Sequence, residues 1–251
     1  LIMARRMVLE GAEVKMVCEL MPYSSGLTRN ILQCLDDFGI PLKLNCTVID
    51  IHGKNRVEGV TIAKVDRNRR PIKGTEEYVE CDTLMLSVGL IPENELSRAM
   101  GVDLDPITGG PVVKENRETT QKGVFACGNV LHVHDLVDFV TLESQTAGEG
   151  AAKYILGLEE EENTVATKGI DGVRYVVPQM INTNCGSDVK LYFRVGQVYN
   201  NAKVFVESNE KVILSRRKPK LTPGEMEDVV IKKEVLETLP VGSELVIRVE
   251  V

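Results

Sequence analysis

The sequence predicts an α/β protein in which partial βαβ units are followed by an all-β domain. Apolar residues at helical spacing alternate with short strand-like runs from residue 1 to about 157. The four consecutive glutamates at 159–162 are typical of a solvated linker. From Val165 onward, strand-like runs recur about every ten residues between Gly, Pro and Asn turns. This second pattern predicts a β-sandwich of immunoglobulin-like size.

Composition limits the classes of function open to this chain. Its 251 residues, 43% of them hydrophobic, are enough to bury a substantial core. Acidic residues outnumber basic ones by 37 to 30, and no basic patch of the kind that nucleic acid requires is visible. No apolar run approaches the roughly 20 residues that cross a bilayer, so membrane insertion is not expected. The six cysteines stand singly, which favours free thiols and a reducing, cytoplasmic location.

The first elements predict an incomplete βαβ unit. Residues 1–9 have helical apolar spacing without a capping residue before them, and Gly11 and a strand over 13–20 follow. This order is that of the helix and second strand of a βαβ unit. We therefore expect a longer protein whose first strand and turn precede the printed sequence.

A second helix is predicted after this strand. Ser24 or Ser25 is expected to cap its start, and the helix should run to about Phe38, with Gly39 as its stop.

Strands are predicted for most of the region from 41 to 89. Alternating residues indicate a strand over 41–53, and 56–82 has the pattern of a β-meander with turns at 68–70 and 73–75. The continuous apolar run at 83–89 is typical of a buried parallel strand. Together these segments predict one α/β unit with an inserted β-hairpin.

The next region, 90–160, mixes loops with two helices. We expect a short helix near 95–100, a turn at Gly109 and Gly110, a strand over 123–129 and a long helix from about Thr141. One face of the long helix is rich in small residues, which permits close packing.

The chain's Gly-x-Gly, Gly148 and Gly150, lies within this helix. Lys153 stands where a third glycine would be, and no strand and turn precede the pair, so we interpret both glycines as packing residues.

Three domains are expected: 1–89, 90–160 and 165–251. The strands predicted for the last of them are the runs 189–195, 202–208, 210–217, 227–235 and 244–251.

Two groups of residues carry candidate chemistry. Glu19 ends a strand where a carboxylate can accept hydrogen bonds from a ribose diol and disfavour a phosphate there, but a solvated surface glutamate fits the pattern equally. His132 and His134 form a His-x-His pair near Cys127 and Asp135. Because no spacing fixes a fourth ligand, we favour a structural or cofactor-facing role over a metal site.

Two longer segments resemble the pyridine nucleotide-disulfide oxidoreductase superfamily. The segment 83–96 (TLMLSVGLIPENEL) contains the Val-Gly-x-x-Pro turn that ends the nicotinamide domain, and 119–155 contains GVFACGN, which closes over the flavin. The likeness is nearest to the subgroup without a redox disulfide that includes sarcosine oxidase α-subunits and oxidoreductases of anaerobic glycerol-3-phosphate metabolism. It implies partial Rossmann-like NAD- and FAD-binding domains, at 1–89 and 90–160, followed by the immunoglobulin-like sandwich as an accessory domain.

The resemblance also assigns cofactor-binding residues. Gly89 belongs to the nicotinamide domain's closing turn, while Gly128 and Asn129 are placed beside the FAD ribityl chain and pyrophosphate. The backbone amides near Thr141 and Leu142 are placed at the flavin N1/O2 edge, where the helix dipole stabilises negative charge. Asn129 departs from the family's usual aspartate: it still offers hydrogen bonds but no charge.

The implied activity is hydride transfer from NADH to FAD and electron delivery to a small-molecule or protein acceptor. No residue is nominated as a catalytic acid or base. The alternative is a non-catalytic module that docks a dehydrogenase partner subunit. Because both phosphate-binding glycine turns are missing, we expect these 251 residues alone to bind neither FAD nor NAD tightly and to self-associate.

Overall fold

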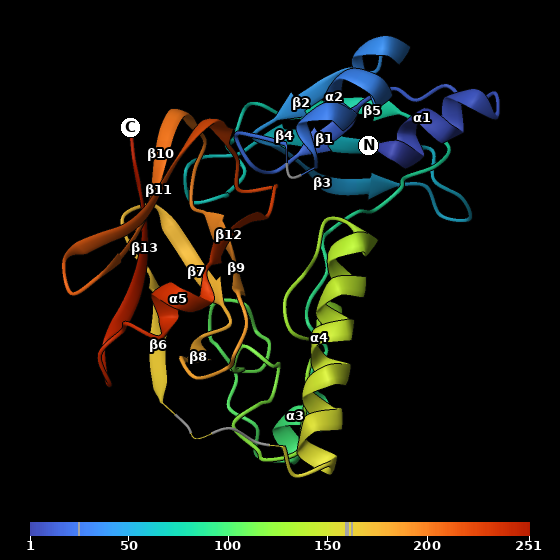
Figure 1. Cartoon of the computed structure of the whole chain (residues 1–251). Helices are drawn as coiled ribbons and strands as arrows, with labels where there is room; N and C mark the ends of the chain where they lie inside the picture. The colour runs from blue at the N-terminus through green and yellow to red at the C-terminus, as the bar shows by residue number, and fades with distance from the viewer. Residues whose placement is uncertain (25, 159–160, 162) are drawn as a thin grey trace. The chain divides into compact units, whose positions relative to one another are not determined.

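The computed structural model describes residues 1–24, 26–158, 161 and 163–251, and it divides the chain into a first unit, 1–88, and a second unit, 89–251 (Figure 1). The predicted linker lies mostly outside the described residues, since 159, 160 and 162 are among those left out. The three-domain division therefore stays a prediction.

The first unit contains the expected parallel βαβ arrangement. β1 and β2 pair in parallel, with Val17 opposite Leu42, and α2 connects them through the short 3-10 turn η1. The bounds are α1 Ile2–Leu9, β1 Val17–Glu19, α2 Thr28–Cys34, η1 Asp36–Phe38 and β2 Leu42–Leu44. This part of the predicted fold class is confirmed.

The start of α2 differs from the prediction. Leu27 is the N-cap residue and makes no side-chain capping bond. The Ser24 hydroxyl instead accepts a hydrogen bond from the Gly26 amide at 3.2 Å, closing a local turn before the helix. The alternative cap, Ser25, lies outside the described residues. The predicted stop is confirmed, because Gly39 adopts a left-handed φ of 65° after η1.

The strand predicted over 41–53 is two strands in different sheets. Asn45, with a φ of 50°, interrupts the run between β2 and β3, Cys46–His52. β3 pairs antiparallel with β4, Gly59–Lys64, which pairs with β5, Glu77–Glu80. The meander and its turns are confirmed.

The buried parallel strand predicted at 83–89 was wrong. No strand forms there, and the side chains of Leu86 and Val88 are 71% and 90% exposed. A continuous apolar run becomes a buried strand only when strands flank it. Within the described residues, β1 pairs in parallel with β2 alone.

Cys46 belongs to the core of the antiparallel sheet, together with Val60 and Ile62, and Cys18 of β1 packs against that cluster. Burial, followed by the neighbouring Cys46, raises the pKa of the Cys18 thiol to about 12. Cys18 is thus a protonated thiol that packs as a small apolar side chain.

The second unit begins with loops that carry α3, Glu95–Ala99, and the expected turn at Gly109. The strand predicted over 123–129 was wrong: Phe125 makes one isolated bridge to Glu118, and Gly128–Val130 form the 3-10 turn η2. The long helix is α4, Val137–Ile155, so it begins four residues before the predicted Thr141. A search of the described helices for one long and apolar enough to cross a membrane finds none.

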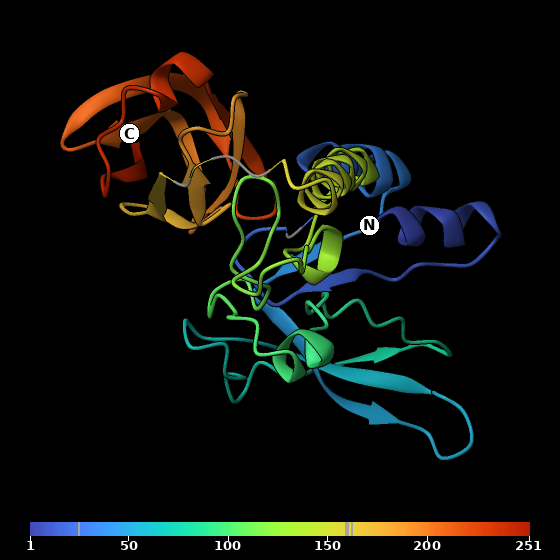
Figure 2. The ribbon, with the colours of Figure 1, turned by 60° about the horizontal axis from the view of Figure 1, so that its bottom comes forward.

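The predicted sandwich is confirmed as two sheets around one core (Figure 2). The larger sheet has the order β11-β10-β13-β6-β8, with β6 and β13 parallel, and the smaller has the order β12-β9-β7. One predicted strand, 227–235, was too long, because its second half is the helix α5. The bounds are β6 Thr164–Gly169, β7 Val173–Val177, β8 Met180–Asn182, β9 Val189–Val195, β10 Tyr199–Ser208, β11 Lys211–Leu221, β12 Glu227–Ile231, α5 Lys233–Leu236 and β13 Glu244–Glu250.

The small-residue face of α4 packs closely at one of its two glycines. A Cβ at Gly150 would lie 2.5 Å from the Asn116 carbonyl oxygen, whereas a Cβ at Gly148 would meet nothing within 4 Å. The packing role is therefore confirmed for Gly150 and wrong for Gly148.

We predict opposite effects of alanine at these two positions. Gly150→Ala should lower the free energy of unfolding by about 1–3 kcal/mol, because the backbone of the opposing hairpin must move. Gly148→Ala is the matched control and should raise it by about 0.5–1 kcal/mol through helix propensity. Urea denaturation measures both, and equal effects would contradict the assigned packing.

Candidate functional site

The start of α4 and the turn at Gly128 form the centre of the candidate site. The N-cap residue, Leu136, is extended and makes no side-chain capping bond, and Val137 after it is 74% exposed. Gly128 has a φ of 72°, and a Cβ there would lie 3.4 Å from Val140 Cγ1. The turn is therefore held close against the first turns of the helix.

A buried carboxylate joins this turn to α4. Glu143 lies in the second turn of α4 and is 1% exposed. The donors around its two oxygens are Arg117 Nε at 3.1 Å and His132 Nε2 at 3.1 Å from Oε1, and the Gly128 amide at 2.8 Å and His134 Nε2 at 2.8 Å from Oε2. We call Arg117, Gly128, His132, His134 and Glu143 the Glu143 network.

The electrostatics of the network favour an ionised Glu143. Burial acts to raise its pKa, but the hydrogen bonds from His132 and His134 and the charge of Arg117 together hold the pKa well below the usual range. A carboxylate can only accept hydrogen bonds, so both imidazoles donate from Nε2. Burial lowers the pKa of His132, which keeps its ring neutral.

A metal ion fits this arrangement poorly. His132, His134 and Glu143 each offer a ligand atom, and these atoms lie within 4.8 Å of one another. However, both carboxylate oxygens already accept two hydrogen bonds, and the Arg117 guanidinium supplies the compensating positive charge. The network is thus better explained as a charge-compensated structural unit.

The predicted cofactor-binding residues at 128–142 lie partly in the Gly128 turn and partly in α4. Asn129 is exposed, and its Oδ1 accepts a hydrogen bond from the His134 amide at 3.1 Å. Thr141 and Leu142 lie in the second turn of α4, and the Thr141 hydroxyl donates to the Val137 carbonyl at 3.0 Å. Since the first amides of a helix are the ones without helical partners, the donors expected at 141–142 lie instead near Val137.

The other two predicted residues are not part of this cluster. Glu19 ends β1 in the first unit, where its Oε1 accepts a hydrogen bond from the Met21 amide at 3.0 Å. Gly89 has a φ of 94° at the first residue of the second unit. The cofactor roles proposed for these residues stay predictions.

Sequence reasoning missed Arg117 and Glu143. A signal was present for Glu143, since it shares a helix face with Ala147 and Gly150 at spacings of four and seven residues, and all three are buried. Arg117 has no comparable signal, because it is a left-handed residue, with a φ of 70°, in an irregular hairpin.

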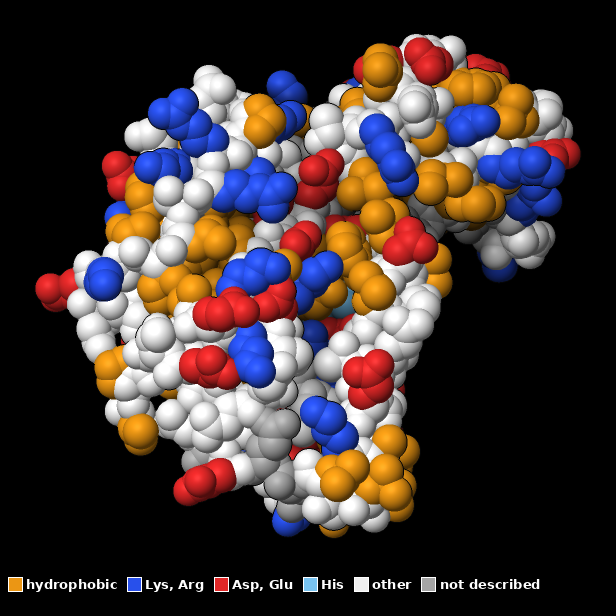
Figure 3. Space-filling model, viewed as in Figure 1, with side chains coloured by type: hydrophobic (Ala, Val, Ile, Leu, Met, Phe, Trp, Pro, Cys, Tyr) orange, Lys and Arg blue, Asp and Glu red, His pale blue; other side chains and the backbone are white. Residues whose placement is uncertain are grey.

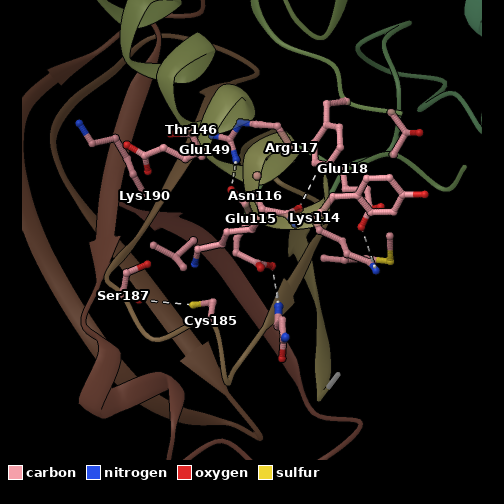
Figure 4. Close-up of a pocket in the computed structure, with 18 of the residues that line it drawn as sticks. Lys114, Glu115, Asn116, Arg117, Glu118, Thr146, Glu149, Cys185, Ser187 and Lys190 are labelled. Carbon is pink, nitrogen blue, oxygen red and sulfur yellow. Dashed lines mark hydrogen bonds and ion pairs between the residues drawn. The ribbon is translucent and has the colours of Figure 1, made fainter. Parts of the chain in front are cut away.

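A cleft of about 940 Å³, lined in part by Arg117, lies between α4, the hairpin at 114–119 and β9 (Figure 4). Its lining contains both acidic and basic side chains; for example, Lys114 Nζ lies 3.7 Å from Glu118 Oε2. Burial raises the pKa of Glu115, another lining residue. On the visible face of the sandwich, Lys and Arg side chains gather at the upper end, and acidic and basic side chains are mixed below it (Figure 3). This mixture gives the cleft no field that selects a ligand of one charge.

We predict that Glu143→Gln lowers the free energy of unfolding by about 3–5 kcal/mol, because Arg117 then keeps a buried charge without its counter-ion. Glu149→Gln is the matched control on an exposed position of the same helix and should change stability little. Urea denaturation checks both, and a loss below 1 kcal/mol for Glu143→Gln would contradict the assigned role.

The network also predicts a pH dependence of stability. Below the ordinary His pKa of 6.5, His132 binds a proton in the unfolded chain but not in the folded one, because burial lowers its pKa. The free energy of unfolding therefore decreases as the pH decreases. A second loss starts below 4.5, where the unfolded Glu143 is protonated before the folded one. His132→Gln should flatten the first step, whereas His52→Gln, at a half-exposed position, should leave it unchanged; chemical denaturation from pH 7 to pH 4 measures this.

Comparison with known proteins places this site in a family. The family described as pyridine nucleotide-disulphide oxidoreductase matches residues 9–151. The small chain of NADPH glutamate synthase from Halomonas elongata is 28% identical over 130 residues, which are 47% of this chain and 28% of that protein. The chain thus spans less than a third of that relative's length.

Two solved structures match part of this chain. Thioredoxin reductase from T. acidophilum is 25% identical, with 57% of this chain and 45% of that chain covered and a TM-score of 0.49. Thioredoxin reductase from Streptococcus pyogenes MGAS5005 is 16% identical, with 60% and 48% covered and a TM-score of 0.35. The family match covers more than half of the 251 residues and does not depend on these two scores. This chain therefore belongs to the pyridine nucleotide-disulphide oxidoreductase family.

Proposed function

We propose that the protein is an FAD-dependent oxidoreductase that takes a hydride from NADH and passes the electrons to a separate acceptor. The observation that carries this proposal is the left-handed Gly128 turn packed against the uncapped start of α4, inside the segment that the family matches. Because the chain spans only part of its relative, the activity of the whole protein remains our proposal.

The residues at this point suit a flavin. An uncapped helix start offers backbone N–H donors and the positive end of the helix dipole, which favours the negative charge that builds on a reduced flavin. A glycine at 128 lets the backbone approach a ligand closely, and exposed Asn129 can donate a hydrogen bond from its side-chain amide. FAD would supply the redox chemistry, while this chain would supply orientation and electrostatic stabilisation.

Glu19 supports NADH as the donor. It ends β1, a strand of a parallel pair, where the carboxylate can meet the ribose diol and repel a 2′-phosphate. The name of the glutamate synthase relative specifies NADPH, so this choice needs a direct test. We also infer a likeness to the subgroup without a redox disulfide that includes sarcosine oxidase α-subunits and oxidoreductases of anaerobic glycerol-3-phosphate metabolism, on the segments 83–96 and 119–155.

The second candidate function is a module for docking a dehydrogenase partner subunit or a second copy of the chain. Exposed apolar side chains on the first unit favour it: Met85 is 53%, Leu86 71% and Val88 90% exposed. Clusters of this kind mark contact surfaces.

Cofactor content and nucleotide preference test the proposal. We expect the protein purified from its native source to carry stoichiometric flavin that NADH bleaches. Glu19→Ala should lower the preference for NADH over NADPH, as the ratio of kcat/KM values, by roughly tenfold because the ribose contact is lost. Glu13→Ala, at an exposed position just before β1, is the control. A colourless protein that copurifies with a partner subunit would instead favour the docking module.

A further inference from the structure

The loop at 131–136, which leads from the Gly128 turn to α4, is bonded to the β-sandwich of the same unit. We call it the connecting loop. The main contact is made by Arg194 of β9, whose guanidinium donates hydrogen bonds to four acceptors, two of them in this loop. These are Asp135 Oδ1 at 2.5 Å, the Val133 carbonyl at 3.0 Å, the Tyr175 hydroxyl at 3.1 Å and the Pro223 carbonyl at 3.2 Å.

Asp135 is held from a second direction. Its other oxygen, Oδ2, accepts a hydrogen bond from the Met226 amide at 2.6 Å, just before β12. The side chains of Arg194 and Asp135 are only 13% and 14% exposed. Charge-assisted bonds shielded from water in this way restrict geometry more strongly than surface ion pairs do.

Aromatic packing continues the contact up to the helix. Tyr192 lies two residues before Arg194 on β9, so the two side chains share one face of the strand. Its ring lies 5.8 Å from the His132 ring, 6.2 Å from the His134 ring and 5.8 Å from the ring of Phe139 in the first turn of α4.

β9 therefore has two buried faces. Val189, Leu191, Phe193 and Val195 belong to the core between the two sheets. The intervening Tyr192 and Arg194 contact the connecting loop and α4. At Tyr192 and Arg194, the outer face of β9 is thus covered by the segment that leads into the candidate flavin site.

A neighbouring contact extends the same interface. The amides of Gln179 and Met180 both donate to the Val113 carbonyl at 3.2 Å, and Val177 shares a small buried cluster with Val113 and Leu131. The sandwich consequently supports both the hairpin and the connecting loop.

We propose that the β-sandwich is a positioning domain for the cofactor turn, with Arg194 and Asp135 as its positioning residues. By fixing the connecting loop, the pair sets where the Gly128 turn and the free amides of α4 stand relative to each other. That this positioning serves flavin binding rests on the proposed function. That the sandwich orders the connecting loop does not.

Hydrogen exchange on the full chain tests the ordering directly. In Arg194→Met, the amides from 129 to 140 should exchange at least tenfold faster than in the wild type, while β10 and β13 stay protected. Arg248→Met is the matched control: Arg248 is also bonded within the sandwich, to Glu207 and Glu250, and stacks on Phe205, but it belongs to the other sheet. It should leave the amides from 129 to 140 unchanged.

Asp135→Asn gives an independent variant should Arg194→Met fold poorly. It keeps the size of the side chain and removes its charge, and its effect on exchange should not add to that of Arg194→Met, because the two residues act as one pair. Unchanged exchange of the connecting loop in Asp135→Asn would overturn the proposal.

Flavin binding supplies the second readout, in the native-length protein. Asp135→Asn should weaken FAD binding at least tenfold and alter the visible spectrum of the bound flavin, whereas Arg248→Met should do neither. If wild-type protein carries no flavin but the loop loosens in Asp135→Asn, the proposed function fails and the ordering role stands. If flavin binds wild type and Asp135→Asn alike, the positioning role fails and the proposed function stands.

Discussion

The ionised carboxylate of Glu143 is the interaction on which the irregular part of the second unit depends. An isolated charge cannot remain ionised in an apolar interior, so its position requires every donor around it. Those donors come from separate places: Arg117 from the hairpin, Gly128 from the turn, and His132 and His134 from the region before α4. One charge on a helix thus determines the course of a long stretch of irregular backbone, where regular ladders are not available to hold it.

Regular elements with strong local signals could be predicted from the sequence. The meander, the parallel pair around α2 and the sandwich strands all follow from alternation and turn residues, which are local properties. The two predicted strands that do not form have a common cause. Residues 83–89 and 123–129 have strand-like composition, but a strand also needs neighbours, and sequence composition does not say whether neighbours are present.

The candidate site was only partly accessible to the same reasoning. Gly128 was assigned through the resemblance of the segment GVFACGN to the family, and the structure places it against α4. Arg117 was not found, because its contact with Glu143 joins residues 26 positions apart through an irregular loop. The histidine pair was assigned a structural or cofactor-facing role rather than a metal site, and the structure shows both rings buried and donating to the same carboxylate. Long-range charge compensation is a property of packing and is invisible in spacing.

The two-sided burial of β9 has a consequence for how this protein can change over time. None of its residues, Val189–Val195, is exposed. Many sheet strands have one solvent-exposed side on which substitutions cost little stability. In β9, however, Tyr192 and Arg194 contact the connecting loop and α4, while the odd-numbered residues lie in the core between the two sheets. Substitutions in this strand are therefore restricted on both of its faces, and replacing the sandwich with an unrelated domain would remove the Arg194 and Tyr192 contacts that hold the connecting loop.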